Sequence, residues 1–312
     1  MNRLVWICAV FMAFSERLPA DTLQYQQGAP HQLTIEYNVD IEQPLPGDPL
    51  VSHVKGEIDA VISARVTSDS ATFSSSLPDE VTIIIDQWSG LSAVNGESRV
   101  FGSLPPKNPG LRYVPSAAVR CGEAIKGRAL TFRVDRDVKV PSVLTIQTAP
   151  ELLQLYREYP TLKLLLPPSF FVTVLEQILA LGGLEIDSGW NRPLQVTITD
   201  GLSVPATFVV EQKGNRFCAN VIADINDAKI ELPSGSVSEG AAQSVTAAVS
   251  GELHGTCEWD RSDALVAHVE MEATYGTHIE GAPGSGNLQV SSRWIVDSVA
   301  SDAPSSRKVM AR

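Results

Sequence analysis

The central stretch Thr148–Trp190 constrains the fold most, because it holds the clearest helical patterns and has β-type sequence on both sides. In its first part, apolar residues recur at helical spacing until Pro160 ends the run. Thr148, followed three residues later by Glu151, predicts a capping box at the start of this helix. The sequence therefore predicts a short helical segment between two β-rich halves.

A second helix is predicted after Pro167-Pro168, with Ser169 as its N-cap. Apolar side chains cover most of its circumference, and its narrow polar stripe consists of Thr173, Glu176 and Gln177. At 1.5 Å per residue the helix is roughly 18 Å long, too short to cross a bilayer. A helix with so little polar surface must be buried, either under a sheet or against a lipid-like ligand. The candidate ligand-binding residues on it are Phe170, Phe171, Val174, Leu175 and Ile178.

Alternating apolar and polar residues predict antiparallel strands on both sides of this segment. The predicted strands are His31–Asp40, Gly56–Thr67, Val81–Asp86, Ala129–Val134, Val138–Thr148, Leu194–Thr199, Ala206–Glu211, Phe217–Ile225, Ser244–Trp259, Ala264–Thr277 and Leu288–Val296. Turns are predicted at Asp200-Gly201 and Lys213-Gly214-Asn215. The expected fold class is mainly β (α+β), with long antiparallel curved sheets in two related halves and a short helical segment between them.

The N-terminal residues have the pattern of an export signal. Arg3 precedes the apolar run Leu4–Phe14, and Ser15 and Ala20 are candidate cleavage sites. An N-terminal anchor and a buried strand are the alternatives, but the apolar run is short for an anchor. We therefore expect an exported protein, periplasmic, on the cell surface or secreted, whose mature chain has no transmembrane span.

Five segments follow from these patterns. They are a signal peptide (1–20), an N-terminal β-rich half (21–148), the central helical segment (149–190), a C-terminal β-rich half (191–298) and a disordered tail (299–312). Thr131–Asp137 and Thr256–Asp263 resemble one another, and each leads from a strand into a turn. This short echo indicates that the two halves are related, although chance similarity is the alternative.

Composition excludes some classes of protein. Hydrophobic residues make up 44% of the chain, which is enough for a sizeable core and excludes global disorder. The formal net charge is −12, and no basic cluster offsets it. Because such a surface repels phosphates, we expect no nucleic-acid partner.

Three cysteines remain after the predicted signal, and their spacing matches no zinc motif. Cys218 and Cys257 lie in strand patterns of the same half, so we expect these two to pair if any disulfide forms. Cys121 would then stay free. The alternative is three free thiols.

The best polar constellation is His268, Glu270 and Glu272, which a period of two places on one strand face. A metal site or an acid–base pair could use this face, but a solvent-exposed face is the ordinary interpretation, with Val269 and Met271 directed into the core. The chain has no G-x-S-x-G nucleophile motif. We therefore predict no catalytic residue, no metal site and no cofactor.

Three further short motifs carry a resemblance to known proteins: Leu166-Pro167-Pro168, Asp187–Trp190 and Trp259-Asp260-Arg261. With them, the chain resembles a family of uncharacterised exported bacterial proteins of unknown function. In that family a β-rich half is followed by a proline segment, a tryptophan turn and closing hairpins. The resemblance implies an exported antiparallel β fold of two similar halves, and it supplies no catalytic residue.

Together these features predict an exported non-catalytic envelope or extracellular protein whose partner is a lipophilic small molecule or an envelope protein. A structural or protein-interaction module is the first alternative, and a hydrolase is the second. A cavity beside the second helix would favour ligand binding, whereas a completely filled interior would favour the interaction module.

Overall fold

The computed structural model describes residues 21–22, 30–43, 50–65, 79–102, 117–136, 144–180, 184–186, 189–199, 202–233, 244–260, 266–279 and 287–300. The expected export signal (1–20) and most of the expected tail (301–312) lie outside these residues.

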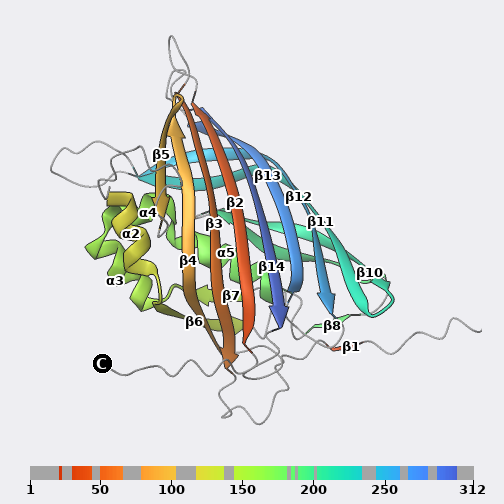
Figure 1. Ribbon diagram of the computed structural model, residues 1–312. Coiled ribbons are helices and arrows are strands. Elements are labelled where there is room, and N and C mark those ends of the chain that lie inside the picture. Colours follow the sequence, from red (N-terminus) through yellow and green to blue (C-terminus); the bar gives the residue numbers. More distant parts are fainter. Residues whose placement is uncertain are drawn as a thin grey trace, which may run out of the picture.

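A single antiparallel sheet dominates the fold (Figure 1). Its strands are β2 (His31–Gln43), β3 (Leu50–Arg65), β4 (Glu80–Val94), β5 (Glu97–Gly102), β6 (Ala129–Arg136), β7 (Leu144–Gln147), β9 (Asn191–Thr199), β10 (Leu202–Lys213), β11 (Arg216–Pro233), β12 (Ser244–Asp260), β13 (Val266–Ile279) and β14 (Leu288–Ala300). Their order is β7-β6-β4-β3-β2-β14-β13-β12-β11-β10-β9, and β5 pairs with β4. β1 (Asp21–Thr22) and β8 (Glu185–Ile186) pair separately. The predicted mainly β, antiparallel, curved architecture is confirmed.

The two runs of strands meet at the pairing of β2 with β14. Their register runs from His31 opposite Ala300 to Glu42 opposite Gln289. Strands from both predicted halves therefore belong to one continuous sheet, with the helical segment inserted between β7 and β9. That the halves are related to each other stays a prediction.

Alternation of side chains, interrupted only locally by register shifts, gives the sheet one apolar face and one solvent-exposed face. Along β13, Val269, Met271 and Ala273 are fully buried, while Glu272 between them is exposed. Side chains of successive strand residues point to opposite faces, so the apolar set forms a continuous inner surface. The solvent-face interpretation of the His268 strand is thereby confirmed.

Four helices lie in the described part of the chain. They are α2 (Ala117–Ile125), α3 (Pro150–Glu158), α4 (Pro160–Leu165) and α5 (Pro168–Leu179). In Figure 1, α2, α3 and α4 group together, whereas α5 lies within the curve of the sheet. α5 contacts β7 and β9, the two end strands of the sheet, and also β13. The sheet therefore curls around α5, which is why this helix has no solvent-exposed face.

Several details of the helices differ from the prediction. The residue before α3 is Ala149, without a side-chain cap bond, so Thr148 is not its N-cap. Pro167 occupies the N-cap position of α5, so Ser169 is not the N-cap. Ser169 lies inside the helix and is buried. Pro160 begins α4 instead of only ending α3, as proline is well tolerated in a first helical turn. α2 was not expected from the sequence at all.

The predicted disulfide between Cys218 and Cys257 is wrong. All three described cysteines are free. Cys218 lies opposite Glu258 on β12, and Cys257 lies opposite Ala219 on β11, so the two are one register position apart. Because neighbouring positions point to opposite faces, Cys257 is buried in the interior while Cys218 lies on the outer face. Their Sγ atoms cannot meet.

Candidate functional site

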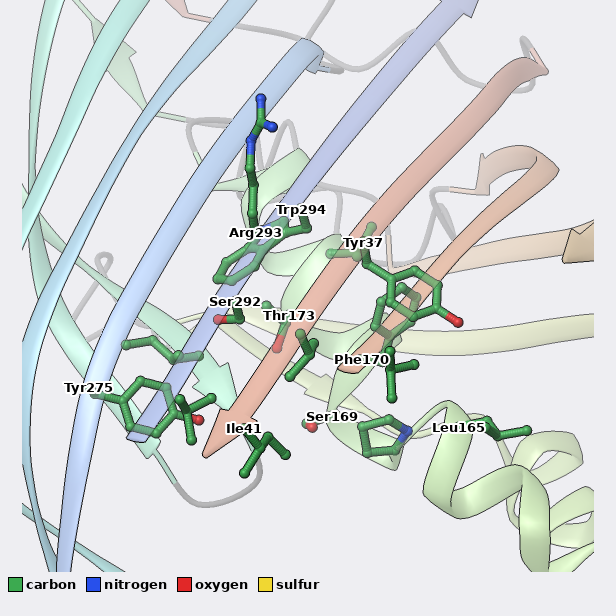
Figure 2. Close-up of a pocket in the computed structure, with 16 residues that line it drawn as sticks. Tyr37, Ile41, Leu165, Ser169, Phe170, Thr173, Tyr275, Ser292, Arg293 and Trp294 are labelled. Carbon is green, nitrogen blue, oxygen red and sulfur yellow. The ribbon is translucent and has the colours of Figure 1, made fainter. Parts of the chain in front are cut away.

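A cavity of about 270 Å³ lies between α5 and the inner surface of the sheet (Figure 2). Its walls come from four strands that are adjacent in the sheet, together with α4, α5 and β9. The side chains are mostly aliphatic and aromatic, and they include Tyr37, Val39, Ile41, Val54, Leu165, Phe170, Val174, Ile198, Tyr275, Val290 and Trp294. Such an apolar concavity with a few polar groups is the usual form of a small-molecule site.

Two of the five candidate ligand-binding residues, Phe170 and Val174, line this cavity. Phe171, Leu175 and Ile178 are not among its lining residues, and each is fully buried in the core. The structure thus places the five residues on different sides of α5. The wall supplied by β2, β3, β13 and β14 was missed, because it depends on strand pairing that the sequence of α5 does not contain.

Phe170 links the sheet to the core beneath the helix. Its ring packs edge-on against Tyr37, with centroids 4.9 Å apart, and against Phe171 at 5.3 Å. Tyr37 is held in turn by Trp88, whose Nε1 donates a hydrogen bond to the Tyr37 hydroxyl at 3.1 Å. Burial raises the pKa of Tyr37 well above its ordinary value, so the phenol is neutral. These contacts give the cavity a rigid aromatic wall.

The polar stripe of α5 faces the interior and the sheet, not the solvent. Gln177 is buried, and its Oε1 accepts a hydrogen bond from Trp294 Nε1 on β14. Glu176 is half-buried and accepts a hydrogen bond from the Thr197 backbone N–H on β9 at 3.1 Å. Thr173 lines the cavity. The stripe therefore fixes α5 against both sides of the curled sheet.

Glu176 gives a prediction about pH. Burial raises the pKa of this carboxyl above the ordinary 4.5, and the Thr197 hydrogen bonds oppose that rise only partly. The folded protein binds the proton more tightly than the unfolded chain. Glu176 therefore destabilises the fold increasingly as the pH rises from the ordinary pKa of the carboxyl to the raised pKa of the folded state. Glu176→Gln keeps an acceptor for Thr197 and removes the charge. We expect a higher melting temperature than the unaltered protein at pH 7.

Thermal unfolding followed by circular dichroism between pH 4 and pH 8 checks this expectation. The advantage of Glu176→Gln should shrink toward pH 4, where the wild-type carboxyl also becomes neutral. An advantage that stays constant with pH, or a lower melting temperature at pH 7, would contradict it.

The cavity opens toward the C-terminal part of β2. Along the first residues of β2, inward positions such as Leu33 and Ile35 are completely buried. Val39 and Ile41 occupy the same inward face and yet remain half-buried, as does Val54 on the paired strand β3. The described protein therefore covers this end of the inner surface only partly.

One charged residue, Arg293, borders the cavity within the described part of the chain. It lies between the inward-facing Ser292 and Trp294 of β14, so its side chain belongs to the outer face. Figure 2 shows its guanidinium directed away from the other lining side chains. Its Nε donates to Glu270 Oε1 at 3.0 Å on the neighbouring strand. The cavity itself is consequently uncharged along its described walls.

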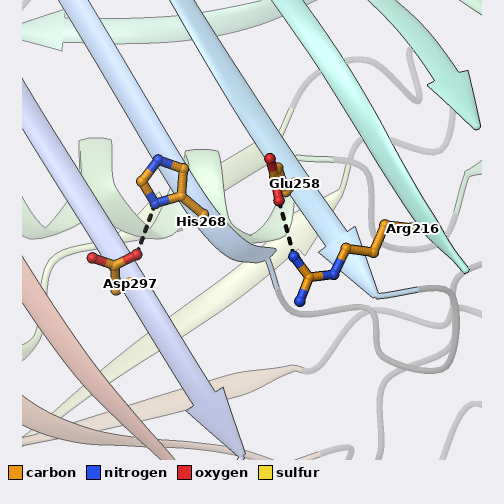
Figure 3. Close-up of polar contacts among 4 residues, drawn as sticks. All are labelled: Arg216, Glu258, His268 and Asp297. Carbon is orange, nitrogen blue, oxygen red and sulfur yellow. Dashed lines mark hydrogen bonds and ion pairs between the residues drawn. The ribbon is translucent and has the colours of Figure 1, made fainter. Parts of the chain in front are cut away.

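The outer face of the sheet carries cross-strand pairs of polar residues (Figure 3). His268 Nδ1 lies 2.7 Å from Asp297 Oδ1, and Arg216 donates to Glu258 at 3.2 Å. These side chains are at least one-third exposed, so each pair contributes little to stability. Among the described residues, no group of three or more histidine, cysteine, aspartate or glutamate side chains is placed to hold a metal ion. None of the helices in the described ranges combines the length and apolarity needed to cross a membrane.

Comparisons with known proteins give distant likenesses. No family model matches the chain, and no curated protein matches it. A solved structure titled "Lipid-protein interactions in lipovitellin" is 13% identical, with a TM-score of 0.47, over 90% of this chain. This chain spans only 27% of that lipovitellin chain.

Two further solved structures are more distant. DynF from the dynemicin biosynthesis pathway of Micromonospora chersina is 7% identical, with a TM-score of 0.20, over 93% of this chain and 88% of its own. An outer membrane channel from Pseudomonas putida F1 is 9% identical, with a TM-score of 0.21, over 91% of this chain and 100% of its own. Likenesses of this degree assign the chain to no family and give it no function.

Proposed function

We propose that the protein is an exported, non-catalytic binding protein for a small lipophilic molecule, held between α5 and the inner surface of the sheet. The observation that carries this proposal is the 270 Å³ apolar cavity. A well-packed interior has few voids larger than a water molecule, so a space of this size is more than a packing defect. It is slightly smaller than the usual small-molecule site of about 300–1,000 Å³, which favours a slender ligand over a bulky one.

The form of the cavity wall also supports binding. Tyr37, Phe170 and Trp294 are large side chains whose positions are fixed by ring packing or by hydrogen bonds. A wall that is already ordered loses little conformational entropy when a ligand binds. The half-buried Val39 and Val54 mark the open end. Export is proposed on the N-terminal pattern. Membership of the exported bacterial family that the chain resembles is proposed on three short motifs, Leu166-Pro167-Pro168, Asp187–Trp190 and Trp259-Asp260-Arg261.

Val54→Trp tests the proposal directly. Val54 lines the cavity from β3, and a tryptophan there would place an indole in the ligand space. The matched control is Val51→Trp on the same strand, because the Val51 side chain is 43% exposed and lies on the opposite face. We expect N-phenyl-1-naphthylamine, a neutral apolar dye, to gain fluorescence with the unaltered protein and with Val51→Trp, and at least tenfold less with Val54→Trp.

Circular dichroism spectra of all three proteins establish that each is folded. If the dye fails to bind the unaltered protein, or binds Val54→Trp as well as Val51→Trp, the cavity is not the binding site. The structural or interaction-module interpretation would then take precedence over ligand binding.

A further inference from the structure

The chemistry of the cavity wall specifies the class of ligand more narrowly than its size does. Three serine and threonine side chains line the space within the described residues, Ser169, Thr173 and Ser292, beside the phenols of Tyr37 and Tyr275, which have partners of their own. Ser292 donates its hydroxyl to the Ala273 carbonyl at 3.5 Å, and Ser169 also has a partner. Thr173 differs from both. Its Oγ1 is buried and has no hydrogen-bond partner in the described part of the protein.

This unpartnered hydroxyl is unusual for a threonine inside a helix. A helical threonine ordinarily returns its hydroxyl to a backbone carbonyl one turn earlier. Here the side chain is 6% exposed and lines the cavity, as Figure 2 shows. A buried polar group without a partner destabilises the fold, and so such groups are rare unless something else satisfies them. A ligand atom that donates or accepts a hydrogen bond would do so.

The rest of the wall excludes a charged ligand group. Arg293 is the one charged lining residue in the described ranges, and its guanidinium is on the outer face with Glu270. A carboxylate drawn into this apolar space would lose its hydration without meeting a cation. The phenol of Tyr37, which accepts the bond from Trp88, can still donate its O–H but is neutral and supplies no cation. The polar end of the ligand must therefore be neutral.

We propose that the cavity binds an uncharged amphiphile, a medium-chain alcohol in its simplest form. Its hydroxyl bonds to Thr173 Oγ1, and its alkyl chain lies along Phe170, Val174 and Ile198. This inference rests on the proposed function, because it specifies what occupies the same cavity. It further states that the protein discriminates an alcohol from the carboxylate of equal chain length.

Isothermal titration calorimetry with 1-decanol and with decanoate at pH 7.4 tests the discrimination. We expect decanol to bind at least tenfold more tightly than decanoate. Thr173→Val keeps the shape of the side chain and removes the hydroxyl, and it should weaken decanol about three- to tenfold, the range of one neutral hydrogen bond. Thr173→Ser, which restores a hydroxyl, should recover most of the affinity. Thr256→Val on the exposed face of β12 is the matched control and should leave the affinity unchanged.

The outcomes separate the inference from the function on which it rests. Decanoate binding as tightly as decanol would overturn the neutral-ligand inference and leave the lipophilic-binding function standing. Unchanged decanol affinity in Thr173→Val would overturn the role of Thr173 and likewise leave that function standing. If the unaltered protein binds neither compound and also fails to bind the apolar dye, both proposals fall.

Discussion

Phe171→Ala is expected to lower the free energy of unfolding by about 3–5 kcal/mol, the usual cost of truncating a buried phenylalanine. Phe171 is completely buried on α5, and its ring lies 6.0 Å from that of Phe132 on β6. It also packs against Phe170 at 5.3 Å. Truncation would therefore leave a void at the point where the helix meets both the sheet and the cavity wall.

Urea unfolding followed by circular dichroism measures this loss. The control is Leu153→Ala on α3, where the side chain is 43% exposed and the expected change is within about 0.5 kcal/mol. The free energy of unfolding should fall with urea concentration at the same slope in both variants. The urea midpoints alone then report the difference in stability. Equal midpoints for both variants would mean that α5 is not the centre of the core.

Gly56→Ala should lower the free energy of unfolding by about 1–3 kcal/mol, a typical cost of overpacking. Gly56 lies directly opposite Tyr37 in the β2–β3 register, and the phenol ring lies over the glycine. A Cβ at Gly56 would overlap the ring carbon Cζ of Tyr37, far inside contact distance. Tyr37 would have to turn away, which would also break the Trp88 hydrogen bond and the packing with Phe170.

The same substitution should therefore weaken binding of the apolar dye as well as stability. The control is Gly276→Ala on β13, where the nearest atom to an added Cβ is the Leu288 carbonyl oxygen at 3.8 Å. Urea midpoints and dye titrations on both variants provide the comparison. A Gly56→Ala protein as stable as Gly276→Ala would show that Tyr37 can repack without cost, contrary to this account.

Local sequence patterns are sufficient to predict most of the strands. Alternation depends only on which face of the sheet is buried, so each strand carries its own signal, as β13 illustrates with Val269 and Met271. The turn after β4 carries a further local signal. Asn95-Gly96 forms a hairpin turn with positive φ at both residues, and this dipeptide is a strong indicator of such turns. It could have predicted β5.

Other features depend on relations between distant segments. Alternation within each strand gives the faces of Cys218 and Cys257, but their placement one position apart on paired strands follows from the register of β11 against β12, which neither strand encodes alone. α2 has a glycine in its middle and no acidic residue in its first turn, and packing against β4, β5 and α4 compensates for these weak local signals. The cavity is the extreme case. Half of its lining residues belong to strands that are more than a hundred residues away from α5 in the sequence. The hydrogen bond between Trp294 and Gln177 is one contact of this kind.

The pairing of β2 with β14 has a consequence for the order of events during biosynthesis. The two strands come from opposite ends of the described chain, and Ser298 and His31 meet although they are 267 residues apart. Contacts of such long range are slow to form, because a very large loop must close first. Until β14 emerges from the ribosome, β2 presents an unpaired edge to which other chains can add. Pairing with β14 therefore closes this part of the sheet, and a nascent chain that lacks β14 exposes the apolar residues of the future cavity wall to association with other chains.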